Sequence, residues 1–136
     1  MNVENKLRPN VKQMAGFVIG DTKTPIQMVN LLKFKDKAEY KDGRETELTG
    51  EEAYKIYATE VAGHVKKVGG KLIFSGVVSR LVIGEVDELW DWVAIVEYPN
   101  RKAMRSMIMD KDYQESEKHR SAGLSGQLNI ETKTHQ

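Results

Sequence analysis

The apolar positions of this chain fall into short segments whose spacing predicts the order strand, helix, strand, strand, helix, strand. The first strand is expected from Gln27 to Phe34, and the last from Gln127 to Glu131. This order builds an α+β domain in which a four-stranded antiparallel sheet carries both helices on one face. Because the other face stays apolar and uncovered, we expect it to pack against a second copy of the chain.

The first helix is the best marked element. Thr49 stands three residues before Glu52, which is the pattern of a capping box that satisfies the free amides at a helix start. Apolar residues then follow helical spacing over residues 54–68, and Gly69 supplies a left-handed exit. The sequence therefore predicts a helix from about residue 50 to residue 68, with one apolar stripe that faces the sheet.

The remaining elements follow from similar signals. Residues 71–83 are rich in β-branched and apolar residues, and Gly76 within them indicates a bulge, a bend or a close approach of backbone. The third strand is expected at 90–98. A second helix is expected from Asn100 to Gly123, with Asp110 capping its continuation.

The segment before the first strand is expected to be a separate addition to the domain. Pro9 opens a short helical pattern that ends at Gly20, and this helix would cover an apolar edge. We therefore expect a helical extension over residues 1–25, a single domain over 26–132 and a flexible tail over 133–136.

Several motifs together resemble a known family. They are Val29-Asn30-Leu31-Leu32-Lys33-Phe34, Gly69-Gly70, Gly84-Glu85 before Trp90-Asp91, Val96-Glu97-Tyr98-Pro99-Asn100-Arg101, Asp112-Tyr113 and His119-Arg120-Ser121-Ala122-Gly123-Leu124. On these motifs residues 26–131 resemble the ferredoxin-like fold. More narrowly, they resemble the dimeric α+β barrel superfamily and, within it, the domain-of-unknown-function 1330 family. The N-terminal extension and a charged insert at 35–49, expected to be a lid or a mobile loop, depart from the compact form of that family.

The resemblance implies a homodimer in which two sheets meet face to face and enclose a barrel-like interior. The superfamily includes cofactor-free oxygenases, isomerases, decarboxylases, haem enzymes and proteins without known activity. A function is therefore not inherited with this fold and has to be argued from the residues of the site.

Composition removes several classes of function. The chain has 136 residues, and its 21 basic and 20 acidic side chains leave a net charge of +1, so neither nucleic acid nor an anionic membrane is an expected partner. The absence of cysteine excludes disulfides, thiolate nucleophiles and iron–sulfur clusters. The apolar patch from Ala15 to Ile19 is too short for a signal sequence or a membrane span, so we expect a cytoplasmic protein.

Three polar residues stand out beside apolar segments. Asn30 lies in an apolar strand, where a buried amide either ties down backbone or points at a ligand. His64 borders the apolar stripe of the first helix, as a general base or donor at a pocket edge or as a half-buried histidine bonded to a carbonyl. Arg80 would contact substrate if it faced the interior, although the cost of burying it unpaired favours the surface or the dimer rim.

The other candidates lie on the second helix and on aromatic positions. His119 is a second carrier for protons, and Arg120 could anchor a carboxylate or phosphate, pair with a glutamate or brace the dimer. Tyr57 and Tyr113 complete the expected substrate contacts. Trp92 offers a flat apolar wall for an aromatic or lipid-like ligand if its face of the strand lines the interior.

A metal site is not expected. Glu60 with His64 and Glu115 with His119 each lie four residues apart and so share a helix face, but no third ligand follows at a recognisable spacing. No cofactor is expected either, and the motifs of nucleotide-binding loops, zinc proteases and serine hydrolases are absent.

Two functions of different classes remain. In the first, the protein binds a small apolar or aromatic molecule in its interior and acts by proton transfer, as a cofactor-free oxygenase or isomerase, with His64 or His119 handling protons. In the second, it is a non-catalytic dimer with a structural, stress-related or partner-binding role. A cavity that touches a histidine would favour the first function, and a packed interior would favour the second.

Overall fold

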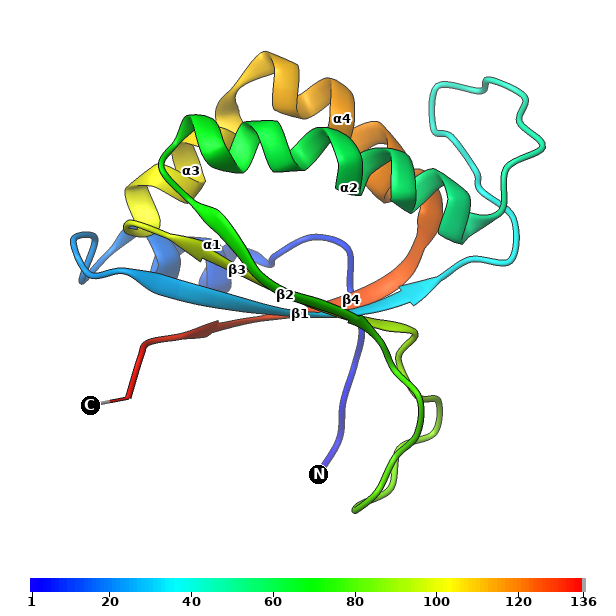
Figure 1. The fold of residues 1–136 in the computed structure, drawn as a ribbon, viewed down its shortest axis with the longest axis horizontal. Helices are drawn as coiled ribbons and strands as arrows, with labels where there is room; N and C mark the ends of the chain where they lie inside the picture. The colour runs from blue at the N-terminus through cyan, green and yellow to red at the C-terminus, as the bar shows by residue number, and fades with distance from the viewer. Residues whose placement is uncertain (136) are drawn as a thin grey trace.

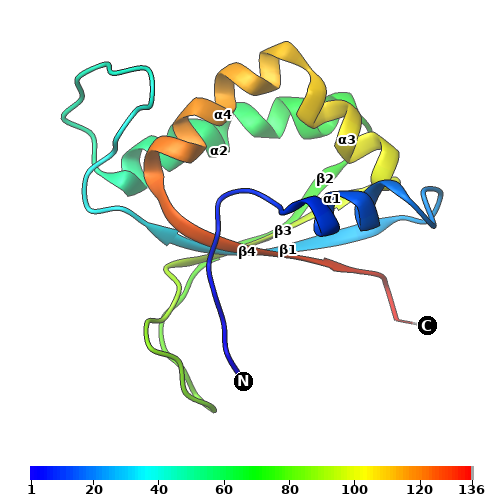
Figure 2. The same cartoon turned by 180° about the vertical axis from the view of Figure 1, so that it is seen from behind.

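A computed structural model describes residues 1–135, in which three helices lie on one face of an antiparallel sheet (Figures 1 and 2). The elements are α1 (Val11–Val18), β1 (Ile26–Phe34), α2 (Gly50–Lys67), β2 (Lys71–Val77), β3 (Trp92–Tyr98), α3 (Arg101–Met109), α4 (Lys111–Gly123) and β4 (Leu124–Thr132). The strand order is β2-β3-β1-β4. This is the predicted ferredoxin-like arrangement, with α1 as the expected extra helix.

The strand register decides which side chains face the helices. Ile26, Met28 and Leu32 of β1 are buried beneath the helices, so their partners in the neighbouring strands share that face. Trp92 and Val96 of β3 share one face, as alternation in the sequence predicted, and the register turns that face toward the helix layer rather than toward a space between two sheets. With α2, α3 and α4 these residues form the main core.

Within residues 1–135 the second face of the sheet carries no helix, and the ribbon views show α2, α3 and α4 together on the opposite side (Figures 1 and 2). By register, the apolar residues on the uncovered face are Val29, Leu31, Phe74, Val93, Ile95, Leu128 and Ile130. Below, this surface is called the open face.

Two strand boundaries differ from those expected. β2 ends at Val77 rather than near residue 83, and β3 begins at Trp92 rather than Trp90. The amide of Val78 donates to the carbonyl of Asp91, and the chain between them extends past the open face (Figure 1). We call residues 78–91 the arm. The sequence predicts strand for residues 78–83 and 90–91 of the arm, but within residues 1–135 no neighbouring strand pairs with them.

The helix caps agree with the sequence. The Thr49 hydroxyl accepts from the amide of Glu52, whose carboxylate accepts from the amide of Thr49. Asp110 ends α3 and begins α4. Gly69 adopts a φ of 83°, which is the left-handed exit that favours glycine.

No helix within residues 1–135 combines the length and the apolar character that crossing a membrane requires.

The N-terminal segment and the insert at 35–49 are both attached to the rest of the domain. Lys6 pairs with Gln127 through two backbone hydrogen bonds, so the N-terminal segment lies along the outer edge of β4. The insert is held at its base, because the amide of Lys35 donates to the carbonyl of Gly123 and Ala38 is buried. The expected tail at 133–136 lies partly outside the described residues, which end at 135.

Helices α2 and α4 approach each other closely at small residues. A Cβ atom placed on Gly123 would lie 2.3 Å from the carbonyl oxygen of Gly50, and one on Gly50 would lie 2.6 Å from the carbonyl oxygen of Gly123. Ala53 and Ala122 are buried nearby. The position of the helix pair over the sheet therefore depends on the absence of side chains at these two glycines.

We expect Gly123→Ala to destabilise the protein by about 1–3 kcal/mol, because the added methyl group must push backbone apart. Gly63→Ala in the open middle of α2 is the matched control, since nothing lies within 4 Å of its Cβ position. That control should stabilise by about 0.5–1 kcal/mol, the usual gain of alanine over glycine in a helix. Chemical denaturation measures both. Equal effects of the two substitutions would contradict the close packing.

Candidate functional site

A row of aromatic side chains lies between the helices and the sheet. Phe34 and Trp92 meet edge to face with ring centres 5.0 Å apart, and Tyr54 lies 5.8 Å from Trp92. Tyr57 continues the row 5.3 Å from Tyr54 and meets Tyr113 at 6.2 Å. Three predicted site residues, Tyr57, Trp92 and Tyr113, are thus brought into one aromatic wall.

Trp92 has an unusual feature within this wall. Its indole Nε1 is buried and has no hydrogen-bond partner among residues 1–135. Buried polar atoms are nearly always bonded, and an unmatched donor costs about 1–3 kcal/mol. The nitrogen is therefore a donor in an apolar interior that still lacks an acceptor.

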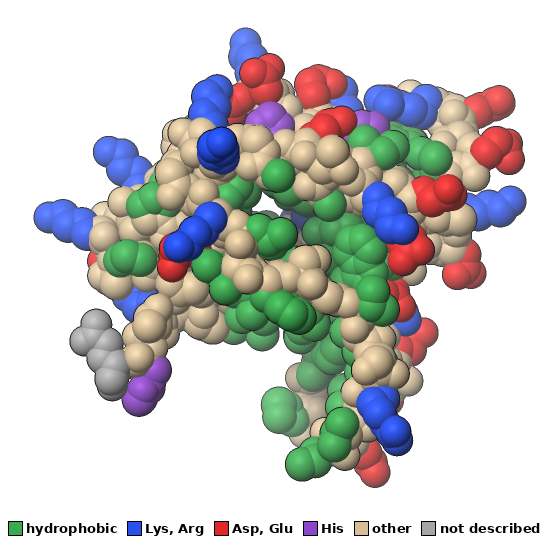
Figure 3. All heavy atoms as spheres, viewed as in Figure 1, with side chains coloured by type: hydrophobic (Ala, Val, Ile, Leu, Met, Phe, Trp, Pro, Cys, Tyr) green, Lys and Arg blue, Asp and Glu red, His purple; other side chains and the backbone are tan. Residues whose placement is uncertain are grey.

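The interior is least covered along the edge strand β2. Leu72 and Val77 pair with the helix-side residues Val96 and Trp92, yet they remain 60% and 74% exposed. In the space-filling view the surface is hollowed between the helix layer and the sheet, and hydrophobic side chains surround the opening (Figure 3). An apolar molecule could approach Trp92 from this side.

Three tyrosines of the interior, Tyr54, Tyr57 and Tyr98, are neutral near neutral pH. The hydroxyl oxygens of Tyr57 and Tyr113 lie 3.0 Å apart, so one donates to the other. Burial raises the pKa of Tyr54, Tyr57 and Tyr98 well above its usual range. These phenols can orient a ligand near neutral pH, but they do not act as bases there.

Asn30 anchors backbone and side chains at the centre of the sheet. Its Nδ2 atom donates to the carbonyls of Met28 and Ala94, each at 3.2 Å. Its Oδ1 atom accepts from Nε2 of Gln127 at 2.7 Å. These contacts match the backbone-tying alternative for Asn30 and leave its amide fully engaged.

Arg120 continues this polar chain on the helix side. Its Nη2 atom donates to Oε1 of Gln127 at 2.6 Å and to the carbonyl of Leu7 at 3.0 Å, while Nη1 donates to Glu117 at 3.1 Å. Asn30 and Arg120, both predicted as substrate contacts, are thus connected through Gln127. The same contacts hold the N-terminal segment against the domain.

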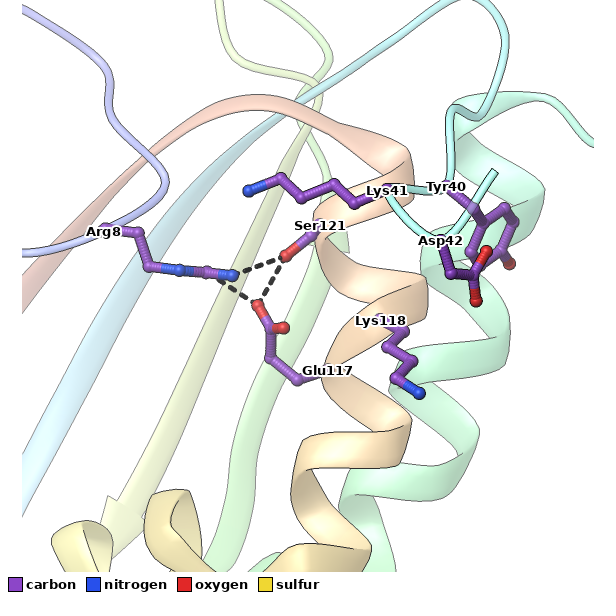
Figure 4. Close-up of a pocket in the computed structure, with 7 residues that line it drawn as sticks. All are labelled: Arg8, Tyr40, Lys41, Asp42, Glu117, Lys118 and Ser121. Carbon is purple, nitrogen blue, oxygen red and sulfur yellow. Dashed lines mark hydrogen bonds and ion pairs between the residues drawn. The ribbon is translucent and has the colours of Figure 1, made fainter. Parts of the chain in front are cut away.

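The series of hydrogen-bonded residues from Asn30 through Arg120 ends at Glu117. The Oε1 atom of Glu117 also accepts from Ser121 at 2.6 Å and pairs with Arg8 at 2.7 Å (Figure 4). Burial raises the pKa of Glu117, but the hydrogen bonds from Ser121 and Arg8 and the charges of Arg8 and Arg120 outweigh it. The pKa of Glu117 therefore lies below its usual range, and its carboxylate is ionised at neutral pH.

His64 ties the two long helices together. Its Nε2 atom lies 2.9 Å from the hydroxyl of Ser116, which donates its hydrogen to Glu60 at 2.7 Å. Because that hydroxyl has one hydrogen, Nε2 of His64 must be the donor. His64 also lines a pocket of about 180 Å³ beside Met107.

No group of three metal-binding side chains occurs in the described part of the chain, and Glu60 is bonded to Ser116.

His119 contacts the insert instead of the aromatic row. Its Nδ1 atom lies 2.6 Å from the hydroxyl of Tyr40, and Arg44 sits 4.5 Å above the Tyr40 ring. Arg80 is exposed and belongs to the arm, outside the aromatic row and the polar groups around Arg120 and His64. The predicted residues therefore do not form a single site.

Sequence reasoning missed several members of these groups. Gln127 could have been found, because it is a polar residue at a helix-side position of a strand, as Asn30 is. Ser116 lies three residues after Tyr113 and so shares its helix face. Nothing in the spacing indicated that Arg8 reaches Glu117, since the contact joins segments more than a hundred residues apart.

Glu117 predicts a pH dependence. Because its pKa is lowered by folding, its contribution to stability is complete above the unfolded pKa and is lost as the pH falls through the folded value. We expect Glu117→Gln to lose less stability than the wild type between about pH 5 and pH 3. Denaturation across that range measures the difference, with Glu115→Gln on the same helix as the control. Parallel curves for wild type and Glu117→Gln would contradict this assignment.

The chain is similar to solved structures over nearly its whole length. The methylated RPA0582 protein is 37% identical, with 97% of this chain and 96% of that chain covered and a TM-score of 0.87. The RPA0582 protein of Rhodopseudomonas palustris, described as of unknown function, is 35% identical. The match covers 98% of this chain and 99% of that chain, again with a TM-score of 0.87. No curated protein matches the chain.

More distant structures share the fold alone. SnoaB of Streptomyces nogalater, described as a cofactor-independent oxygenase, is 12% identical over 83% of this chain and 95% of that chain, with a TM-score of 0.53. The family model described as Domain of unknown function (DUF1330) matches residues 43–132, which is more than half of the chain. The resemblance drawn from the sequence motifs is confirmed, and the chain belongs to the DUF1330 family.

Proposed function

We propose that this protein binds a small aromatic molecule that carries a carbonyl or another acceptor oxygen, in the space between its helices and its sheet. The observation that carries the proposal is the buried Nε1 of Trp92, which has a hydrogen to donate and no acceptor among residues 1–135. A ligand oxygen placed on this nitrogen would recover the hydrogen bond that the protein itself does not make.

The surroundings of Trp92 support an aromatic ligand. The rings of Phe34 and Tyr54 flank the indole, and edge-to-face contacts with further rings are favourable in such an environment. Leu72 and Val77 offer an apolar approach along β2, because the helices leave them exposed. Apolar walls with few polar groups are typical of small-molecule sites.

The same geometry supports binding more directly than proton transfer. His64 is engaged with Ser116 and His119 with Tyr40, so neither predicted proton carrier belongs to the aromatic row. The interior tyrosines remain neutral. SnoaB, described as a cofactor-independent oxygenase, has the same fold, but at 12% identity its chemistry is not carried over.

We also propose that the protein is a homodimer joined through its open face. A contiguous apolar surface on an antiparallel sheet is favoured to find a partner, and a twofold dimer brings identical surfaces together. The open face carries Val29, Val93 and Ile95 near its centre, with Lys33 on one side and Glu97 on the other. Lys33 is already bonded to Asp91 and the carbonyl of Leu89, and Glu97 to Gln27 and Lys71, so the apolar residues carry this proposal.

The ligand proposal predicts a specific response at Trp92. We expect aromatic ketones such as α-tetralone to bind better than tetralin, the matching hydrocarbon without the oxygen. Nitrogen–proton NMR of the two indole groups should show the Trp92 signal moving on ketone binding. Trp90 is an internal control, because its Nε1 already donates to Asn5.

Trp92→Phe should reduce ketone affinity by about tenfold, which corresponds to the loss of one hydrogen bond, and should leave tetralin binding nearly unchanged. Calorimetric titration measures both affinities. If the ketones and the hydrocarbons bind equally well, or if bound ketones leave the Trp92 signal in place, the proposed site is wrong.

A further inference from the structure

A pocket distinct from the one beside His64 lies where the insert and the N-terminal segment meet α4. Its volume is about 250 Å³. The lining residues are Arg8, Tyr40, Lys41, Asp42, Glu117, Lys118 and Ser121 (Figure 4). Three segments that are distant in the sequence therefore contribute to it, and all three are held in place by the backbone and side-chain contacts described above.

Positive charge is in excess around this pocket. Glu117 is shared by two guanidinium groups, those of Arg8 and Arg120, so one carboxylate faces two cations. The other acid of the lining, Asp42, is paired with Arg44. Lys118 has its own partner in Glu115, outside the lining.

Lys41 adds a further cation. Within residues 1–135 its ammonium group makes neither an ion pair nor a hydrogen bond, and in the close-up its side chain extends above Ser121 toward the side where Arg8 lies (Figure 4). The carboxylates around the pocket are thus already matched by arginines, whereas the Lys41 charge is unmatched. A small anion is the group that would balance it.

Hydrogen-bond donors for an anion are available on two sides. Arg8 has five N–H groups, and within residues 1–135 its acceptors are the carbonyl of Leu7, the hydroxyl of Ser121 and Glu117. Its guanidinium therefore retains donors, and Lys41 contributes three more. The Tyr40 ring, held by His119 and Arg44, supplies an apolar side to the same pocket.

We propose that this pocket binds a small organic anion through its carboxylate or phosphate group, with Arg8 and Lys41 as the charged contacts and Tyr40 beside the organic part. Guanidinium and ammonium groups recognise both kinds of oxyanion. The site is independent of the aromatic interior, so a failure of the ligand proposal for Trp92 leaves it intact.

The test uses benzoate and inorganic phosphate as probes, titrated into the full-length protein at constant ionic strength set with chloride. Saturable binding of benzoate alone assigns the pocket to carboxylates, binding of phosphate alone assigns it to phosphates, and either result supports the site. Lys41→Gln should lower the affinity for the probe that binds by about fivefold, which is the upper range for the loss of one exposed charge contact. Lys37→Gln, an exposed lysine of the same insert outside the pocket, should leave affinity unchanged.

Lys41→Gln is expected to fold normally, because Lys41 is exposed and its ammonium group makes no hydrogen bond or ion pair within residues 1–135. Arg8→Gln is a second variant that should abolish binding, and thermal unfolding shows whether it stays folded. The proposal is overturned if neither probe binds saturably to the wild type. It is also overturned if Lys41→Gln and Lys37→Gln weaken binding equally, since that result indicates only a general attraction of anions to a basic surface.

Discussion

The structure depends on one constraint, which is that all the helices packed on the sheet lie on a single face of it. The helix pair α2–α4 is narrow because Gly50 and Gly123 let the two backbones approach closely. Such a pair covers β1 and its neighbours but leaves β2 exposed on the helix side. Two apolar surfaces follow from this arrangement: the approach along β2 toward Trp92, and the whole open face on the other side of the sheet.

Polar residues divide the helix side into regions with different roles. Side-chain hydrogen bonds join Asn30, Gln127, Arg120 and Glu117 in a series. This network holds the N-terminal segment along β4, so it acts as structural support. On the same face but toward the β2 edge of the sheet, Trp92 retains an unmatched donor among aromatic rings. Satisfied networks make a fold unique, whereas an unsatisfied group in a native interior calls for an explanation by function. This contrast is why the ligand is placed at Trp92 and not at Arg120.

The sequence predicted the fold because each signal was local. The capping box at Thr49, the second cap at Asp110 and the alternation in β3 concern neighbouring residues, and all three occur in the structure. The arm was misread because apolar composition does not reveal whether a partner strand is present. The site was predicted only in part. Trp92 was identified, but the contacts of His64 and Arg120 depend on segments that only the folded chain brings together.

The most direct test of the one-sided sheet is its association in solution. Sedimentation equilibrium at micromolar concentration should give a mass of about twice the 15.4 kDa of the chain, because burying the open face of each copy removes its apolar residues from water. Ile95→Glu, which places a charge at the centre of that face, should sediment as a folded monomer. A wild-type protein that remains a monomer of 15.4 kDa under these conditions would contradict the account.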